Sequence, residues 1–142
     1  MGQEDFIKRQ IDQLGKVLGK LLADLLRLKS GGQMDAGMEV ANQAFKMELG
    51  LNVDELLSIP AKSFVTTLLE SRTFTDNNFA DLAEIFYLLA EELYACSAET
   101  EKMKQLYERS LIIFELLESM SLTYSFDRHS KIVKMKNVLQ AG

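Results

Sequence analysis

The chain has 142 residues, enough for one domain that buries about 70% of the surface exposed by the unfolded chain. Hydrophobic residues make up 47% and charged residues 26%, values typical of a soluble globular protein. One proline, no tryptophan and many strong helix formers argue against a loop-rich or β-sandwich fold. The net charge of −5 argues against nucleic acid as a partner.

The first predicted helix, residues 4–29, is long and amphipathic. Its apolar residues are spaced alternately by four and three positions, which is a heptad seam. A stripe of small residues, Gly15, Gly19 and Ala23, lies beside the seam and indicates a close backbone approach. The sequence leaves open whether the seam is an internal helix crossing or a self-association face. The seam comprises Ile7, Ile11, Leu14, Leu18, Leu21, Leu25 and Leu28.

The Gly31-Gly32 pair predicts a joint between this helix and a helical body formed by residues 33–142. A second helix is predicted over 34–49, with Gly50 as its stop. Its inner face is expected to carry Met38, Ala41, Phe45 and Leu49.

A short helix then begins at Asn52, which is a favourable N-cap residue, and ends before Pro60. The next predicted helix ends near residue 72. It is expected to present Phe64, Leu68 and Leu69 to the core.

Two further helices are predicted around the polar break at residues 97–100, and a last helix over 127–140. No window alternates with period two, so no sheet is expected. The first of these helices is expected to bury Phe79, Leu82, Ala83, Phe86, Leu89, Ala90, Leu93 and Tyr94. The second is expected to bury Met103, Leu106, Tyr107, Ser110, Ile113, Phe114 and Leu117, and the last Ile132, Met135, Val138 and Leu139.

The hairpin over about 82–115 resembles a tetratricopeptide (TPR) repeat in the order of its bulky, small and aromatic residues. It departs from the pattern at Glu91, where a small residue is usual, and at Glu115, where a proline is usual. The resemblance implies an antiparallel hairpin that packs through these positions and presents surfaces to other proteins. The matching positions are Tyr87, Ala90, Tyr94, Met103, Tyr107 and Ser110, although alanine is usual at position 103.

The whole chain also resembles a small bacterial family of all-helical, TPR-like proteins of unknown function. The resemblance lies in residues 6–14, in the break at residues 56–60 and in the order of the elements. It implies an all-α fold and brings no functional residues with it.

Charge is distributed unevenly along the chain. Residues 1–29 carry six basic and four acidic side chains, residues 30–126 six and sixteen, and residues 127–142 four and one. We expect basic terminal helices to pack near an acidic middle, the alternative being a basic surface for nucleic acid or anionic lipid.

The sequence contains no catalytic, cofactor or metal constellation that we can identify. Cys96 and His129 are predicted on separate helices, Cys96 as a buried structural residue and His129 as a solvated or locally hydrogen-bonded one. Zinc and di-iron sites need more histidine and cysteine ligands than the chain offers. Glutamates recur every seven residues at Glu101, Glu108 and Glu115, and we expect them to form a solvated stripe on one helix. Three methionines on one helix, Met34, Met38 and Met47, are expected to fill the core.

The single cysteine excludes an internal disulfide, residues 1–10 lack the apolar core of a signal peptide, and no apolar run reaches 18 residues. We therefore expect a cytoplasmic protein. The best interpretation is a single all-α domain of six or seven helices with TPR-like hairpins, acting as a non-enzymatic protein–protein interaction or scaffold module with an unknown partner.

The residues first expected to bind that partner are those of the heptad seam, and two copies of the seam would make a homodimer. One alternative is a peripheral membrane protein that uses the same helix. The second alternative is an enzyme with a noncanonical site. The membrane alternative rests on the basic residues around the apolar face, Lys8, Arg9, Lys16, Lys20 and Arg27.

Overall fold

The computed structural model describes the backbone of residues 2–71, 74–121 and 125–141, and within these ranges all side chains except those of residues 2–8, 10, 11 and 71. This part of the chain is all-α, as predicted, with seven α-helices, two 3-10 helices and no strand. The elements are α1 (Gly2–Ser30), η1 (Met34–Ala36), α2 (Gly37–Leu49), α3 (Val53–Leu57), η2 (Ala61–Ser63), α4 (Phe64–Ser71), α5 (Asp76–Ala95), α6 (Thr100–Met120) and α7 (Phe126–Ala141).

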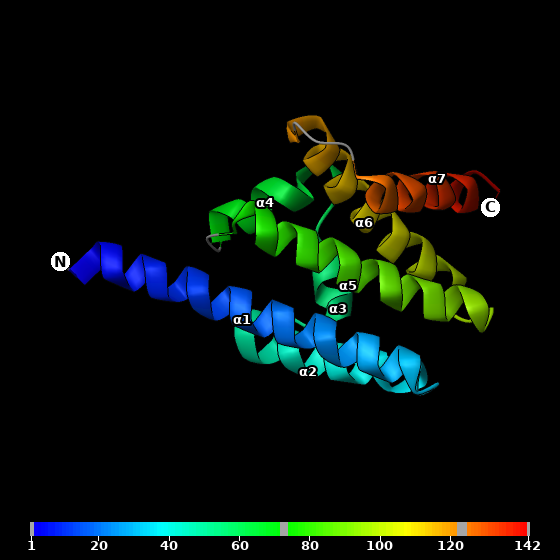
Figure 1. The fold of residues 1–142 in the computed structure, drawn as a ribbon, viewed down its shortest axis with the longest axis horizontal. Helices are drawn as coiled ribbons and strands as arrows, with labels where there is room; N and C mark the ends of the chain where they lie inside the picture. Colours follow the sequence, from blue (N-terminus) through cyan, green and yellow to red (C-terminus); the bar gives the residue numbers. More distant parts are fainter. Residues whose placement is uncertain (1, 72–73, 122–124, 142) are drawn as a thin grey trace.

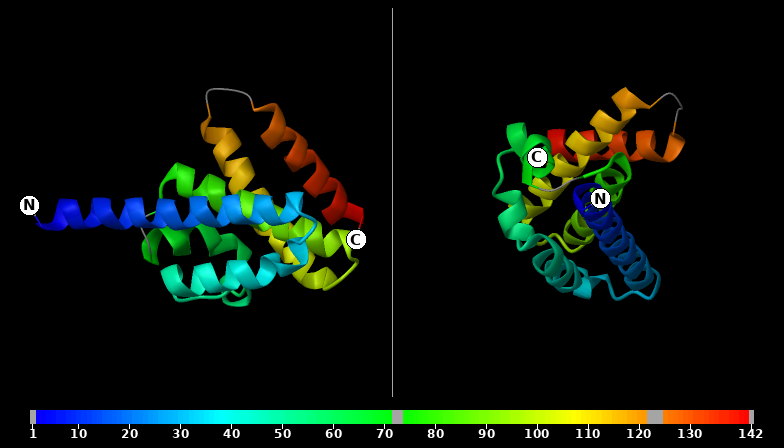
Figure 2. Two further views of the ribbon diagram at one scale, coloured as in Figure 1. Left: turned by 60° about the horizontal axis from the view of Figure 1, so that its bottom comes forward. Right: turned by 90° about the vertical axis from the view of Figure 1, so that its left-hand side faces the viewer.

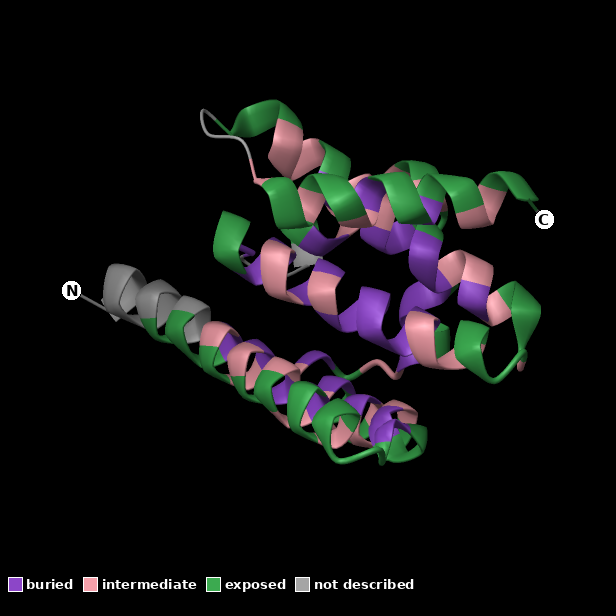
Figure 3. Ribbon diagram, turned by 45° about the vertical axis from the view of Figure 1, so that its right-hand side comes forward, coloured by how far each residue is buried: buried purple, intermediate pink, exposed green. Residues whose placement is uncertain are grey.

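Helix α5 is the central element of the fold. The pair α1 and α2 lies along one side of it, whereas α6 and α7 lie on the other side (Figure 1). Buried residues follow α5 along most of its length (Figure 3), from Asn78 to Ala90. The core is therefore continuous from α1 through α5 to α6.

The heptad seam of α1 packs inside the chain. Leu14, Leu18, Leu21 and Leu25 are between 0% and 3% exposed, and Leu28 is half-buried. A Cβ atom added to Gly37 of α2 would lie 3.3 Å from Leu25 Cδ2, which shows how closely α1 and α2 approach. Of the two alternatives left open by the sequence, the structure shows the internal crossing; Ile7 and Ile11 lie outside the described side chains.

The small-residue stripe of α1 marks a close approach at one position. A Cβ atom at Gly15 would lie 3.4 Å from Asn78 Oδ1 on α5, but one at Gly19 would meet nothing within 4 Å. Ala23 is exposed. The stripe is therefore not a continuous contact surface in this fold.

The Gly31-Gly32 joint is a tight turn. Gly32 has φ 71°, and the amide of Gln33 donates to the carbonyl of Leu28 at 2.8 Å. Such a left-handed stop favours glycine because a Cβ atom is strained there. The turn folds the chain back so that α2 lies beside α1 (Figure 2).

The short helix α3 is fixed at both ends. Asn52 Oδ1 accepts from the amide of Glu55 at 2.8 Å, and Glu55 Oε1 accepts from the amide of Asn52 at 3.0 Å, which completes a capping box. At the other end, the guanidinium group of Arg109 on α6 donates to the carbonyls of Leu57 at 3.2 Å and Ile59 at 3.1 Å. These bonds fasten the connection between α2 and α4 onto α6.

Four expectations about burial are wrong. Tyr94 and Leu69 are each 50% exposed, because Tyr94 lies in the last turn of α5 and Leu69 near the end of the short α4. Cys96 is exposed because it follows the end of α5, where the chain turns through Ser97 and Glu99 with positive φ. Met47 is 88% exposed on α2. Met34 is buried as expected, and the half-buried group contains Met38, Leu93, Leu117, Val138 and Leu139.

Candidate functional site

A pocket of about 280 Å³ lies where the end of α1, η1 and the second half of α5 meet. α5 contributes four of its residues from just over two helical turns. The chain enters η1 directly from the Gly31-Gly32 turn, so that turn positions the opposite wall. The lining residues are Lys29, Gly32, Met34, Leu88, Glu91, Glu92 and Ala95.

The pocket combines an apolar floor with charged walls. Met34 and Leu88 are 9% and 5% exposed, so they form a firm surface rather than a mobile rim. Glu91 and Glu92 supply two carboxylates, and Lys29 supplies one positive charge. The formal charge of the lining itself is −1, but Lys134 of α7 neutralises Glu91, which leaves Glu92 to attract a cationic group.

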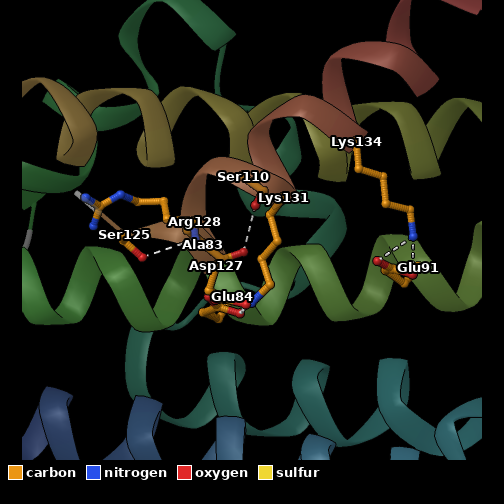
Figure 4. Close-up of polar contacts among 9 residues, drawn as sticks. All are labelled: Ala83, Glu84, Glu91, Ser110, Ser125, Asp127, Arg128, Lys131 and Lys134. Carbon is orange, nitrogen blue, oxygen red and sulfur yellow. Dashed lines mark hydrogen bonds and ion pairs between the residues drawn. The ribbon is translucent and has the colours of Figure 1, made fainter.

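Glu91 connects this pocket to α7. Lys134 Nζ donates to both carboxylate oxygens of Glu91 at 2.8 Å (Figure 4). Burial acts to raise the pKa of Glu91, but hydrogen bonds from Lys134 and Tyr87 outweigh it and hold that pKa below its usual value. Glu91 is thus ionised and committed to two neighbours, whereas Glu92 accepts from the Cys96 thiol at 3.7 Å.

The face between α5 and α7 is a second charged region. Lys131 Nζ donates to Glu84 Oε2 at 2.6 Å and to Asp127 Oδ2 at 3.0 Å (Figure 4). Its ammonium group also lies 5.3 Å from the centroid of the Tyr87 ring, within the range of a cation–π contact. The prediction that basic terminal segments pack against an acidic middle is confirmed here for the C-terminal helix.

The six TPR-like positions lie on α5 and α6, which pack against each other. The rings of Tyr87 and Tyr94 each pack edge-on against Tyr107, with centroid distances of 6.0 and 6.4 Å. Ser110 Oγ donates to the carbonyl of Ala83 at 2.8 Å, so a small residue permits close approach. Ala90, Tyr107 and Ser110 are fully buried, Met103 and Tyr87 are 7% exposed, and Tyr94 is half exposed.

Cys96 and His129 do not form a catalytic pair in this arrangement. They lie on separate elements, and both are exposed. Desolvation and the Glu92 carboxylate raise the pKa of the Cys96 thiol, which disfavours the nucleophilic thiolate.

The described residues contain no cluster of three or more histidine, cysteine, aspartate or glutamate side chains arranged to bind a metal ion. Glu101, Glu108 and Glu115 are all exposed on α6, as predicted. None of the helices in the described ranges is both long and apolar enough to cross a membrane.

Comparison with protein-family models, with curated proteins and with solved structures finds no match to this chain. The resemblances to the TPR pattern and to a bacterial family therefore stay predictions. The local geometry of the pocket and of the face under α7 carries the functional argument.

Sequence reasoning missed the pocket as a site. It named Gly32 as part of a joint and Met34 as core filling, but it assigned neither to a pocket with α5. The available signal was Glu91, a charged residue at a position where the hairpin pattern prefers a small one.

Proposed function

We propose that this protein is a non-enzymatic protein-interaction module that accepts a lysine or arginine side chain of a partner in the pocket between α1, η1 and α5. The observation that supports the proposal is the lining itself, an apolar floor beside carboxylates. Long basic side chains have the same composition, with an apolar stem and a charged end.

The pocket residues would have distinct roles in binding. Met34 and Leu88 would pack against the methylene stem of the incoming side chain. Glu92 would meet its charge, because Glu91 is already held by Lys134 and Tyr87. A charge-assisted hydrogen bond at this partly enclosed site adds affinity and rejects acidic partners.

The two functions that rely on the apolar face of α1 are less well supported. A homodimer through the seam and a membrane-surface protein both require Leu14, Leu18, Leu21 and Leu25 on an outer surface. These residues are in the core of this structure. The proposal therefore rests on the surface around α5 rather than on the seam.

The test uses the methionine methyl groups as probes in an NMR titration. The peptide acetyl-Leu-Arg-Leu-amide is added to protein with labelled methionine methyls, and acetyl-Leu-Gln-Leu-amide serves as the neutral control. We expect saturable shifts of the Met34 resonance with the arginine peptide, whereas Met47, 88% exposed on α2, reports non-specific effects.

Two variants make the titration specific for the pocket. Glu92→Gln should weaken binding of the arginine peptide by about tenfold, which corresponds to about 1.4 kcal/mol. Glu101→Gln removes the same charge from an exposed site on α6 and should leave binding unchanged. Equal shifts with the glutamine peptide, or binding that is indifferent to Glu92→Gln, would contradict the proposal.

A further inference from the structure

We propose that the face of α5 and α6 beneath α7 is a second docking surface, for a basic amphipathic helix of a partner protein, and that α7 occupies it in the isolated chain as a built-in competitor. This surface shares Glu91 with the pocket proposed above, but its other residues lie outside the pocket and it has its own test. Its residues come from two long helices, which provide a rigid platform.

The apolar contact that α7 makes is small for a helix of 16 residues. Ile132 and Met135 are its buried residues, and Val138 and Leu139 are half-buried. α1 buries four leucines among its described side chains. Because apolar burial supplies most of the stabilisation of a packed helix, α7 is held more weakly than α1.

Ion pairs account for much of the remaining contact between α7 and its neighbours. Lys131 pairs with Glu84 and Lys134 with Glu91 on α5, whereas Lys136 pairs with Glu115 and Arg128 with Glu118 on α6. All eight side chains are partly exposed to solvent, between 19% and 49%. Such pairs contribute little net stability but select the charge and register of the helix that binds.

One of these pairs is incompletely satisfied. Within the described part of the chain, Arg128 Nε and Glu118 Oε2 are both buried and have no hydrogen-bond partner. A buried donor or acceptor that lacks a partner destabilises the arrangement that leaves it so. A partner helix that satisfies Glu118 more fully would therefore have an advantage over α7 on the same surface.

The contacts of α7 define the helix that the surface accepts. Its basic residues Arg128, Lys131 and Lys134 recur every three positions, and the apolar residues Ile132 and Met135 are also three apart. A ligand with the same two stripes would present cations to both α5 and α6. The tethered α7 competes at a high effective concentration, so a partner binds well only where α7 is displaced.

The test begins by displacing α7 in the full chain. Met135→Glu places a carboxylate on the buried face of α7, at a position that is 0% exposed. The matched control, Val133→Glu, adds the same charge to the same helix at a position that is 44% exposed. A fluorescent synthetic peptide with the sequence of residues 126–141 is the probe, and its binding is followed by anisotropy.

We expect the Met135→Glu protein to bind this peptide at least tenfold more tightly than the wild type or the Val133→Glu protein does. Hydrogen exchange should show that α7 loses protection while α5 and α6 keep theirs. Lys131→Gln combined with Lys134→Gln provides a second way to loosen α7, because it removes the two ion pairs that join α7 to α5 and adds no charge to the core.

Further substitutions place the peptide on this surface and not in the pocket. In the Met135→Glu background, Glu84→Gln with Glu118→Gln should weaken peptide binding, and Glu92→Gln should leave it unchanged. A peptide of the same composition in scrambled order should bind at least tenfold more weakly.

Three results would overturn the inference. They are loss of protection in α5 and α6 together with α7 in both loosened proteins, equal peptide affinity for wild-type and loosened proteins, and binding that depends on Glu92 instead of Glu84 and Glu118. The last result would assign the peptide to the pocket and so leave the proposed function standing.

Discussion

At the scale of single residues, Arg109 holds several elements of the fold together. Its side chain is 6% exposed and donates to two backbone carbonyls while pairing with Glu108. Its guanidinium carbon lies 5.8 Å from the centroid of the Phe64 ring, so it also packs against the start of α4. One side chain therefore joins α6 to α3, to the following loop and to α4.

Arg109→Leu should destabilise the protein by about 2–4 kcal/mol, because it leaves two carbonyls without their donor and removes the ion pair with Glu108. Arg27→Leu is the matched control. The Arg27 side chain is 75% exposed and pairs with Asp24, so its loss should cost less than about 0.5 kcal/mol. Urea unfolding of both variants measures the difference. Equal losses would mean that Arg109 does not hold the α3 connection.

At the scale of elements, α7 should respond to acid through Glu91. The pKa of Glu91 is lower in the folded protein than its usual value of 4.5. A carboxyl group of this kind stabilises the fold above its unfolded pKa, and the contribution is lost as the pH falls through the folded pKa. The pKa of Lys131 is shifted in the opposite direction: burial lowers it, but hydrogen bonds to Glu84 and Asp127 outweigh burial and raise it. Lys131 therefore stays protonated through this acid range, and its own titration adds no pH dependence there.

The wild type should lose more stability than Glu91→Gln as the pH falls from about 5.5 to about 3, because the variant has no carboxylate to protonate at this position. The measurement is the free energy of unfolding in urea at a series of pH values. Glu101→Gln, on the exposed face of α6, should follow the wild-type curve. If the Glu91→Gln curve also follows the wild type, the bond between Lys134 and Glu91 does not contribute to stability.

The local pattern of the sequence predicts the elements well because each carries its own start, stop and periodicity. Asn52 caps α3, Gly50 ends α2 with φ 73°, and the leucines of α1 are buried in the predicted register. Periodicity shows which residues share an apolar face, but it does not show how far along the helix a neighbouring element covers that face. Tyr94 and Cys96 are exposed for this reason, since both lie at the end of α5 where the chain turns away.

The candidate site was less predictable than the elements. The pocket exists because the turn at Gly32 places Met34 opposite Leu88, which lies 54 positions later in the sequence. The angle at which α1 meets α5 decides how far Met34 lies from Leu88, and no local sequence pattern encodes that angle. The charge of α7 against the acidic middle was predictable, because opposite charges in neighbouring segments are visible in the sequence.

At the scale of the whole molecule, α5 has neighbours on both sides, and the two sides differ in character. On the side facing α1 the contact is made by buried leucines, whereas on the side facing α7 it is made largely by partly exposed ion pairs. Stability should therefore depend mainly on the packing of α5 against α1 and α6, and exchange with partners on the surface beneath α7. A substitution in the heptad seam therefore tests whether the seam stabilises the single chain.

Leu18→Glu should destabilise the single chain by at least about 3 kcal/mol, because Leu18 is 1% exposed and its replacement buries an unpaired charge. That loss is a large part of the total of about 5–15 kcal/mol that is typical of a domain. Thermal unfolding followed by circular dichroism should show the same decrease at every protein concentration, because the broken contacts lie within one chain. Lys16→Glu, at an exposed position of α1, should unfold near the wild-type temperature.

Light scattering on the same samples distinguishes packing of the seam within one chain from packing between two chains. A dimer that dissociates on Leu18→Glu with its helix content and unfolding temperature retained would place Leu18 between chains, and α1 would then have to leave α5 in the assembled protein.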